Sequence, residues 1–321
     1  MIKITVIITA FNRKEFLIKA IESALNQSLN REYYEVIVLK NFIDESIDSF
    51  IKEHKLLSIY SQEKLYPRWI FEAVKVSNGD IICFLEDDDL YKDNHLEAIY
   101  VEFSHYEKLG FLKTGFELYS EIDDIKIYDV FKKVYKNIDV TSLDDSLVKL
   151  LKIQRYGINA IISAIGIKKS ILIKAESFLT NFYLFDYFLP YFALFEGYDL
   201  IALSDVSIRY RIGDSWTHII SGDIQKNIIQ KDNLLKNVIK DYNEMKYIFK
   251  SKKHFLNAID YQIVKLNIDL GTLSNFKRKP EVILLYIYCS IIELNAKRIA
   301  YLFLFFIYRF SGRRLMSWPP K

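Results

Sequence analysis

The chain has 321 residues, of which 51% are hydrophobic and 15% aromatic. This length suits one large α/β domain or a domain with an appendage, and the apolar content supports a substantial core and argues against disorder. With 44 basic and 41 acidic residues the net charge is only +3, which gives no basis for broad nucleic-acid binding.

The sequence contains two cysteines, Cys83 and Cys289, and both lie in apolar runs. They favour a reducing compartment and predict neither a disulfide framework nor a cysteine-based metal site. Residues 1–8 form a short β-branched run followed by polar residues, which differs from a secretory signal. We therefore expect a cytoplasmic protein.

Apolar runs and amphipathic segments alternate through the first 90 residues. We predict strands at 3–9, 34–39, 58–60 and 81–85, and helices at 14–27, 44–54 and 70–76. Strands that alternate with helices at this spacing predict a parallel sheet with helices on both faces. We interpret residues 1–90 as a nucleotide-binding half.

The alternation changes after residue 90. We predict helices at 94–109, 142–154, 168–178 and 185–195, and strands at 111–119, 125–131, 159–167, 199–203 and 206–212. From residue 224 onward the pattern predicts helix to the end of the chain. We interpret residues 91–220 as an acceptor-binding half and residues 221–321 as a C-terminal helical extension.

The most informative segment is residues 79–91. An apolar run at 81–85 ends abruptly in four consecutive acids at 86–89. A buried strand has this composition, and the carboxyl ends of strands are where open α/β sheets bind ligands. Four carboxylates repel one another unless they share a cation or a hydrogen-bonding ligand. The alternative is a solvated acidic turn.

Segments 6–13, 35–38 and 78–89, followed by Asp186 and residues 199–211, resemble in this order the inverting nucleotide-sugar glycosyltransferases of family 2, which have the GT-A fold. This resemblance implies a Rossmann-type mixed α/β sheet flanked by helices over residues 1–220. It also implies a nucleoside-diphosphate sugar as donor. A divalent cation, Mg²⁺ or Mn²⁺, would neutralise the departing diphosphate.

The acidic segment stands where this family has its D-x-D motif. By the resemblance, Asp88 is the metal ligand, Glu86 and Asp87 lie toward the nucleotide, and Asp89 supports the site. Glu86 departs from the usual Asp by one methylene but keeps its acceptor oxygens.

An inverting mechanism also needs a general base that takes the proton from the acceptor hydroxyl. The family has an Asp at the start of a helix in its second half, and Asp186 is the best match. Burial among the neighbouring aromatic residues would raise its pKa toward a useful value. Alternatively, Asp186 is only a negative charge favoured by the helix dipole.

Four residues after the first strand, Thr9, Phe11, Asn12 and Arg13, stand where the family contacts the nucleobase and ribose. Asn12 can also cap the helix that we expect from residue 14.

Two arginines and a histidine near the end of the resemblance have candidate roles. Arg209 and Arg211 are two residues apart, so in a strand they share a face and can meet the diphosphate. Alternatively, both are solvated surface charges. His218 is a candidate third metal ligand or diphosphate contact, although a lone histidine is more often structural.

One departure from the family affects the nucleotide. At the end of the second strand the family usually has an Asp that reads the nucleobase, and this segment contains Lys40 instead. Lysine cannot accept a hydrogen bond from a base N–H. Asn41 or Asp44 can take over this role, and UDP, GDP and dTDP all stay open.

The C-terminal part contains two apolar blocks, 282–292 and 299–308, separated by a charged segment at 293–298. Each charge at mid-membrane costs about 2.5–3.5 kcal/mol, which disfavours a single spanning helix. Wound as one helix, the segment is apolar around most of its circumference, and the arginines within 309–314 suit anionic headgroups. We expect this tail to lie on the cytosolic face of a membrane, near a glycan or lipid-linked acceptor. The alternative apolar partners are the catalytic domain and a second copy in a homodimer.

A nucleotidyltransferase and an inactive scaffold are the alternatives to a metal-dependent inverting glycosyltransferase. A nucleotidyltransferase would also use an α/β sheet and a metal, but it normally has a Gly-rich basic loop after the first strand, and residues 9–13 contain no glycine. An inactive, membrane-bound scaffold is disfavoured by the intact acids at 86–89. The sequence leaves the sugar, the acceptor and the oligomeric state open.

Overall fold

The computed structural model describes residues 2–119, 138–140, 161–179, 182–211 and 224–269, with the single positions 147, 150, 151, 153 and 158. The chain divides into two compact units, one of Met1–Leu143 with Tyr156–His218 and the other of Asp144–Arg155 with Ile219–Lys321. The expected strand at 125–131, the candidate ligand His218 and the tail from residue 270 onward lie outside the described residues.

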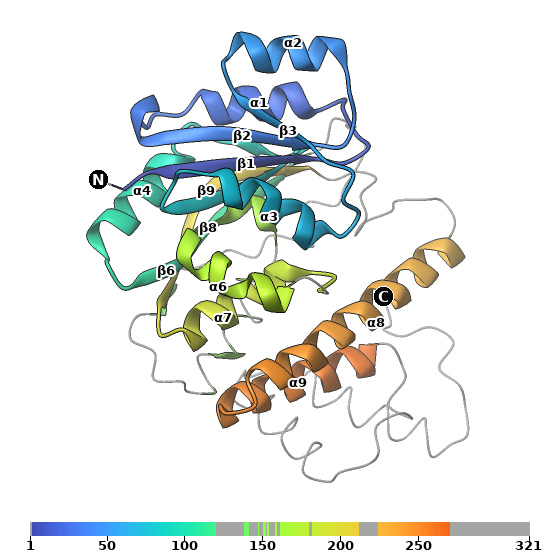
Figure 1. Ribbon diagram of the computed structural model, residues 1–321. Helices are drawn as coiled ribbons and strands as arrows, with labels where there is room; N and C mark the ends of the chain where they lie inside the picture. Colours follow the sequence, from blue (N-terminus) through green and yellow to red (C-terminus); the bar gives the residue numbers. More distant parts are fainter. Residues whose placement is uncertain are drawn as a thin grey trace. The chain divides into compact units, whose positions relative to one another are not determined.

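The first unit is built on one mixed sheet (Figure 1). Its strands are β1 (Ile4–Ala10), β2 (Tyr34–Lys40), β3 (Leu57–Tyr60), β4 (Ile81–Glu86), β5 (Leu90–Tyr91), β6 (Leu109–Tyr119), β7 (Ile138–Val140), β8 (Ile165–Lys168) and β9 (Asp199–Arg211). Their order in the sheet is β3-β2-β1-β4-β8-β6-β9-β5, and β7 pairs with β9. Strands β1 to β4 are parallel, whereas β8 joins β4 in the antiparallel direction. The predicted mixed α/β sheet is confirmed.

Helices cover both faces of this sheet (Figure 1). They are α1 (Leu17–Leu25), α2 (Glu45–Glu53), α3 (Tyr66–Val76), α4 (His95–His105), α6 (Lys169–Leu179) and α7 (Leu189–Phe195). Helices α1, α2 and α4 share one buried cluster with the sheet, and α3, α6 and α7 pack on the other face. This unit also contains three short 3₁₀ turns among its described residues, η1 (Arg31–Tyr33), η2 (Ile162–Ala164) and η3 (Phe185–Tyr187).

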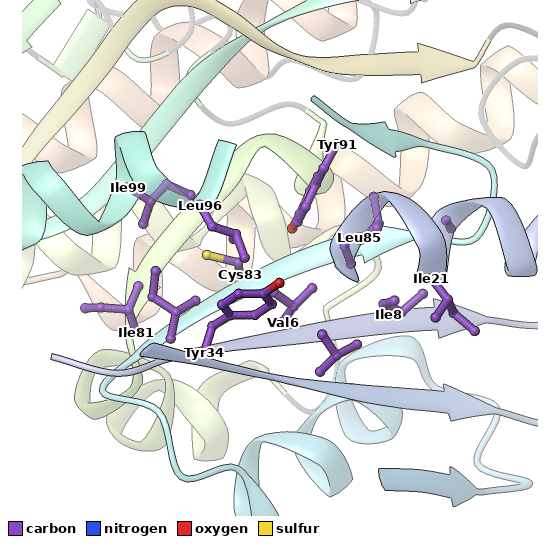
Figure 2. Packing of buried hydrophobic residues seen from close by; sticks show 14 of the residues in the cluster. Val6, Ile8, Ile21, Tyr34, Ile81, Cys83, Leu85, Tyr91, Leu96 and Ile99 are labelled. Carbon is purple, nitrogen blue, oxygen red and sulfur yellow. The ribbon is translucent and has the colours of Figure 1, made fainter. Parts of the chain in front are cut away.

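Burial on both faces explains the apolar sequences of the central strands. All seven residues of β1 and the first five of β4 are buried. Figure 2 shows the packing on the α1 side, where Val6, Ile8 and Leu85 of the strands share a cluster with Ile21 of α1 and Leu96 of α4. Full burial of such a side chain stabilises the fold by about 1.5–3 kcal/mol. This packing holds the ends of β1 and β4 in place.

Two expected strands, at 199–203 and 206–212, are a single strand, β9. In its pairing with β6, Lys113 is level with Ala202 and Gly115 with Val206, so β9 contains two extra residues at this irregularity. A Cβ added to Gly115 would lie 2.8 Å from the main-chain oxygens of Ser204 and Asp205. Residues 204 and 205, which separated the two expected strands, therefore belong to a bulge, and the glycine opposite them leaves the necessary space.

Other boundaries also differ from the prediction, among them the start of α3, which is Tyr66 and not residue 70. The strand expected at 159–167 is only β8, because Ile161 has a φ of 62° and η2 follows it. The helix expected at 94–109 ends at His105, since β6 begins at Leu109. The helix expected at 185–195 is divided into η3 and α7.

The described part of the second unit contains two helices, α8 (Ile224–Ile248) and α9 (Lys253–Asp269), which pack against each other. Phe249 and Phe255 meet at the connection, with ring centroids 5.0 Å apart, and Lys246 Nζ lies 2.5 Å from Asp260 Oδ1. The prediction of helix from residue 224 holds as far as Asp269, apart from this connection. No helix among the described residues is long and apolar enough to cross a membrane.

Candidate active site

Parallel strands of the sheet end together at one edge, and the predicted nucleotide-binding segments lie there. Thr9 of β1 is level with Leu39 of β2 and with Glu86 of β4. The N–H of Asp87 donates to the carbonyl of Thr9 at 3.1 Å, which ties the acidic segment to the end of β1. The carboxyl edge of parallel strands is the usual ligand-binding edge of open α/β sheets.

Arg13 holds two of the four acids. Its Nε donates to Asp87 Oδ2 at 2.7 Å, and its Nη2 lies against Asp87 Oδ1 and 2.7 Å from Asp88 Oδ1. Burial raises the pKa of Asp87, and the ion pair with Arg13 opposes that change. The guanidinium therefore compensates the charge that the acidic segment concentrates here.

Arg211, the last residue of β9, contacts Asp88 as well. Its Nε lies 3.2 Å from Asp88 Oδ2, and its backbone N–H donates to Asp89 Oδ1 at 3.0 Å. Its guanidinium carbon lies 4.0 Å from the centre of the Phe16 ring. Both carboxylate oxygens of Asp88 thus face an arginine.

Ser163 in η2 is a site residue that the sequence analysis missed. Its hydroxyl donates to Asp89 Oδ2 at 2.5 Å and accepts from the backbone N–H of Glu86 at 3.1 Å. Ile161, two residues before Ser163, has a left-handed backbone. Strained β-branched residues of this kind cluster at functional sites. A lone hydroxyl in the apolar run 161–165 is the only sequence signal for this role.

The remaining acids are strongly perturbed by their surroundings. Burial, followed by the charges of Asp89 and Asp88, raises the pKa of Glu86 well above its ordinary value. Burial and the charge of Asp88 raise the pKa of Asp89 to about 8, although its hydrogen bonds oppose this. A cluster of this kind retains protons unless a positive charge is supplied.

Lys113 of β6 is a second residue that the sequence analysis missed. Its side chain is buried, and Nζ donates to the carbonyl of Ile161 at 2.6 Å. Burial lowers the pKa of Lys113 to about 7, while the charges of Asp186 and Asp89 act in the opposite direction. A lysine inside the apolar strand 111–119 was the available signal.

Asp186, the candidate base, is half-buried in η3 next to aromatic residues. Its Oδ1 accepts from the backbone N–H of Tyr187 at 3.1 Å. The adjacent Phe185 ring lies 5.7 Å from Tyr66 and 5.9 Å from Phe84, between centroids. The charge of Asp186 contributes to the raised pKa of Glu86, so the two carboxyl groups belong to one electrostatic neighbourhood.

Asn12 and Asn41 form a reciprocal pair at the ends of β1 and β2. The N–H of Asn12 donates to Asn41 Oδ1 at 2.7 Å, and Asn41 Nδ2 donates to Asn12 Oδ1 at 2.8 Å. Asn12 has a φ of 56°, a left-handed conformation that Asn tolerates. Helix α1 begins at Leu17 with Phe16 at the N-cap position, so the alternative role of Asn12 as a cap is wrong.

The two other polar residues near this edge have internal partners. Lys40 is buried, and its Nζ lies 2.7 Å from both Asp48 Oδ1 and the carbonyl of Phe42. Asp44 caps α2 by accepting from the N–H of Ile47 at 3.2 Å, and it also pairs with Lys14. Asn41, rather than Asp44, lies beside Asn12.

Phe11 and Arg209 lie at the margins of the acidic cluster. The Phe11 ring packs edge-on against Trp69, with centroids 5.5 Å apart. Arg209 is exposed, lies 3.7 Å from Glu117 and stacks on Tyr119 at 4.9 Å, whereas the Tyr119 hydroxyl donates to the carbonyl of Asp88. Of the two arginines on β9, Arg211 alone contacts the acids among the described interactions.

The carboxylate oxygens are suited to a divalent cation, because Mg²⁺ and Mn²⁺ prefer hard oxygen ligands. Among the described residues, no three His, Cys, Asp or Glu side chains are arranged to hold a metal ion. The oxygens of Asp88 lie on Arg13 and Arg211 instead. A cation at Asp88 would therefore compete with these guanidinium groups for the carboxylate oxygens.

Comparison with solved structures identifies the class of fold. Residues 1–349 of TarS from S. aureus match with a TM-score of 0.59 at 11% identity, over 89% of this chain and 78% of that chain. The same TarS fragment in complex with UDP-GlcNAc matches with a TM-score of 0.54 at 13% identity, over 89% and 79%. The mannosyltransferase PcManGT from Pyrobaculum calidifontis, in complex with GDP-Man and Mn²⁺, matches with a TM-score of 0.51 at 12% identity, over 98% and 88%. The fold is that of GT-A glycosyltransferases, as predicted.

Comparison of sequences identifies the family. Residues 5–137 match the model of glycosyl transferase family 2. An uncharacterized glycosyltransferase of Rickettsia bellii is 32% identical over 123 residues, 37% of this chain and 17% of that protein. The poly(ribitol-phosphate) beta-N-acetylglucosaminyltransferase TarP of Staphylococcus aureus is 32% identical over 108 residues, 31% of this chain and 32% of TarP. The matched part of the chain thus spans less than a third of these relatives' lengths. The match of residues 5–137 to glycosyl transferase family 2 confirms the predicted resemblance.

Proposed function

We propose that this protein is a metal-dependent, inverting glycosyltransferase that moves a sugar from a nucleoside diphosphate to a hydroxyl or phosphate acceptor. The observation that carries this proposal is the gathering of acids, arginines and a candidate base at one edge of the sheet. Asp88 faces both Arg13 and Arg211, and Asp186 acts electrostatically on Glu86. Family membership of residues 5–137 supports the same conclusion.

The donor is a nucleoside-diphosphate sugar in this proposal. Arg13 and Arg211 offer planar guanidinium groups, which match phosphate oxygens well. The Asn12–Asn41 pair retains donor and acceptor groups for a nucleobase beside Thr9. UDP-GlcNAc is the first donor to test, because TarS binds it, and GDP-Man is the second.

Asp88 would hold Mg²⁺ or Mn²⁺, with His218 as a further candidate ligand. Bound there, the cation would offset the negative charge of the departing diphosphate. Glu86 and Asp87 would face the nucleotide, and Asp89 would keep the segment in shape through Ser163 and the backbone of Arg211.

Asp186 would act as the general base. As the acceptor oxygen forms its bond to C1 of the sugar, the bond from C1 to the diphosphate oxygen breaks and Asp186 takes the acceptor proton. A single displacement of this kind inverts the configuration at C1. Asp186 is half-buried, and its neighbour Phe185 packs on Tyr66 and Phe84, which holds the η3 segment in place.

The proposed acceptor class follows from TarP and from the apolar tail, and the proposed location follows from the tail. TarP acts on poly(ribitol phosphate), so a polyol-phosphate or another glycan is one acceptor class. The apolar tail from about residue 281 supports a lipid-linked acceptor at the cytosolic face of the membrane.

The test of this function is donor turnover by the full-length protein and by Asp186→Asn. We expect the wild type to release nucleoside diphosphate from UDP-GlcNAc or GDP-Man with Mn²⁺ and an acceptor, and to lose activity with EDTA. A positioned base contributes about 10²–10⁴-fold, so Asp186→Asn should lower turnover by that factor while binding the donor normally.

Asp205→Asn serves as the control, because Asp205 is an exposed acid on the β9 bulge. It should leave turnover within about twofold of the wild type, since exposed substitutions away from a site have small effects. Near-normal turnover in Asp186→Asn together with a large loss in Asp205→Asn would move the base to Asp205.

A further inference from the structure

The two carboxylate oxygens of Asp88 have different arginine partners. Arg13 Nη2 lies 2.7 Å from Oδ1, and Arg211 Nε lies 3.2 Å from Oδ2. The Asp88 side chain is only 9% exposed, so these guanidinium groups, and not water, are its main partners. We refer to Arg13 and Arg211 in this position as the arginine clamp.

The clamp opposes a cation that arrives alone. A divalent ion that approaches Asp88 meets two positive charges within a few ångströms, in a site where burial weakens screening by water. It must also displace a guanidinium, and among the described ion pairs Arg211 has no carboxylate partner other than Asp88. A cation without a nucleotide therefore binds against both repulsion and the loss of an ion pair.

A diphosphate changes this balance, because it gives the arginines another partner. Phosphate oxygens accept forked hydrogen bonds from guanidinium as carboxylates do, and they carry more negative charge. When an arginine turns toward the phosphates, an oxygen of Asp88 becomes available to a cation. The cation then lies between Asp88 and the phosphates, and no charge is left uncompensated.

We propose that Arg13 and Arg211 are specificity-determining residues that make cation binding at Asp88 conditional on a bound diphosphate. This inference rests on the proposed function, since it deepens the account of the same donor site. It differs from that account because the cation and the nucleotide would bind as a coupled pair, with the arginines as the switch between them.

The local contacts indicate different parts for the two arginines. Arg13 grips Asp87 with two nitrogen atoms as well as Asp88. Arg211 is anchored by its backbone N–H on Asp89 and by the Phe16 ring, while its side chain makes a single, longer contact with Asp88. Arg211 is therefore the arginine that can turn with the smaller loss of contacts.

The coupling can be measured as a change in affinity. Full-length protein is titrated with Mn²⁺, and free Mn²⁺ is followed by electron paramagnetic resonance, first alone and then with saturating UDP or GDP. Coupling between two sites typically changes affinity about 5–150-fold, and it must act equally in both directions. We expect the wild type to bind Mn²⁺ more tightly by a factor in this range with nucleotide, and to bind nucleotide more tightly with Mn²⁺ by the same factor.

Substitution of the clamp should remove this dependence. Arg211→Gln and Arg13→Gln keep N–H donors but lose the positive charge, so each should bind Mn²⁺ more tightly than the wild type in the absence of nucleotide. The coupling factor should fall in the same variants, to the part that the direct bonds between the phosphates and the cation supply. Arg211→Lys keeps the charge and should behave more like the wild type. Lys52→Gln, which removes an exposed cation of α2, should leave both measurements unchanged.

Thermal unfolding identifies any variant that fails to fold, and Arg211→Gln carries the test if Arg13→Gln is unstable. Equal Mn²⁺ affinity in the wild type with and without nucleotide would overturn the inference, as would an unchanged nucleotide-free affinity in Arg211→Gln. Either result can occur in a protein that still transfers sugar, so the proposed function would survive it. Absence of Mn²⁺ binding in every state would overturn this inference and metal dependence together.

Discussion

Among the described residues, Lys113 is the buried lysine whose charge interacts with the acidic cluster. Its Nζ donates to the carbonyl of Ile161, and its charge interacts with Asp186 and Asp89 from inside the sheet. Burial, followed by the charge of Lys113, lowers the pKa of His95 to about 3, which keeps that imidazole neutral. An ammonium group at this depth costs desolvation free energy, and the acids above it offset part of that cost.

Replacement of Lys113 by Met separates its electrostatic effect from its packing, because the two side chains have similar length. We expect Lys113→Met to fold and to lose at least about tenfold in transfer rate, the change that corresponds to about 1.4 kcal/mol of activation free energy. The reason is that Asp186 and Asp89 lose a positive charge. Lys75→Met, which removes an exposed lysine of α3, should leave the rate unchanged and serves as the control.

The pH dependence of stability gives a second readout. Burial lowers the pKa of Lys113 from 10.5 to about 7. Between these values the unfolded chain binds more protons than the folded one, so this residue makes folding more favourable as the pH rises from about 7 to about 10.5. The free energy of unfolding of the wild type should rise relative to Lys113→Met across that window, by up to ~1.4 kcal/mol per pH unit. A constant difference in urea denaturation would show that Lys113 does not titrate there.

At the scale of elements, strand β9 connects the fold to the site. It pairs with β6 along most of its length, passes the bulge opposite Gly115, and ends at Arg211 beside Asp88. A shift of the bulge would change which residues of β9 reach the acidic cluster, because neighbouring strand residues point to opposite faces.

Gly115→Ala tests this role of the bulge. The added Cβ would meet two backbone oxygens at 2.8 Å, which cannot move without moving β9. We expect a loss of about 1–3 kcal/mol in the free energy of unfolding from urea denaturation, with weaker nucleotide binding.

Gly166→Ala is the matched comparison on β8. There the nearest atoms are side-chain carbons of Ile99 at 3.1 and 3.3 Å, which can shift by a rotamer adjustment. It should be the milder substitution in both measurements. A larger loss in Gly166→Ala than in Gly115→Ala would mean that the bulge tolerates a side chain and that β9 is not held by Gly115.

The parts of the fold that sequence predicted well are those in which local composition and tertiary environment agree. Strands β1 and β4 are buried on both faces, so their apolar runs carried enough information by themselves. The start of α2, expected at residue 44, is similar, since the bond from the N–H of Ile47 to Asp44 joins residues close in sequence, although the sequence analysis considered Asp44 only for the nucleobase.

The parts that sequence missed depend on contacts between distant segments. Ser163 meets Asp89 and Glu86 across more than seventy residues, and nothing near Ser163 in sequence marks that partnership. The bulge in β9 was predicted as a break between two strands, whereas the space that allows it is supplied by Gly115 of another strand. The arginine partners of Asp88 were likewise invisible, since the family resemblance assigned that carboxylate to a metal.

At the scale of the whole molecule, the chain combines a sheet-based unit with a second unit that contains α8 and α9. The apolar blocks at 282–292 and 299–308 follow α9 in the sequence and lie outside the described residues. Their composition requires an apolar partner larger than a soluble surface normally offers. The choice between lipid and protein as that partner decides where the enzyme meets its acceptor.

We predict that the tail attaches the protein to anionic membranes. Full-length protein should float with vesicles that contain phosphatidylglycerol, and a chain that ends at Pro280 should not. Each arginine near an anionic surface contributes about 1 kcal/mol, so Glu at positions 309, 313 and 314 should weaken binding by at least about two orders of magnitude. Binding of the wild type should also weaken as salt increases.

Charge reversal at positions 250, 252 and 253, between α8 and the start of α9, is the control for a nonspecific effect of net charge. It changes the same number of positive charges outside the tail and should leave flotation intact. If instead the full-length protein stays with the soluble fraction, and the chain that ends at Pro280 loses its fold or its self-association, the tail packs on protein. A helix apolar around most of its circumference must be covered by one partner or the other. In that outcome the acceptor would reach Asp186 from solution, and the proposal of a lipid-linked acceptor would lose its main support.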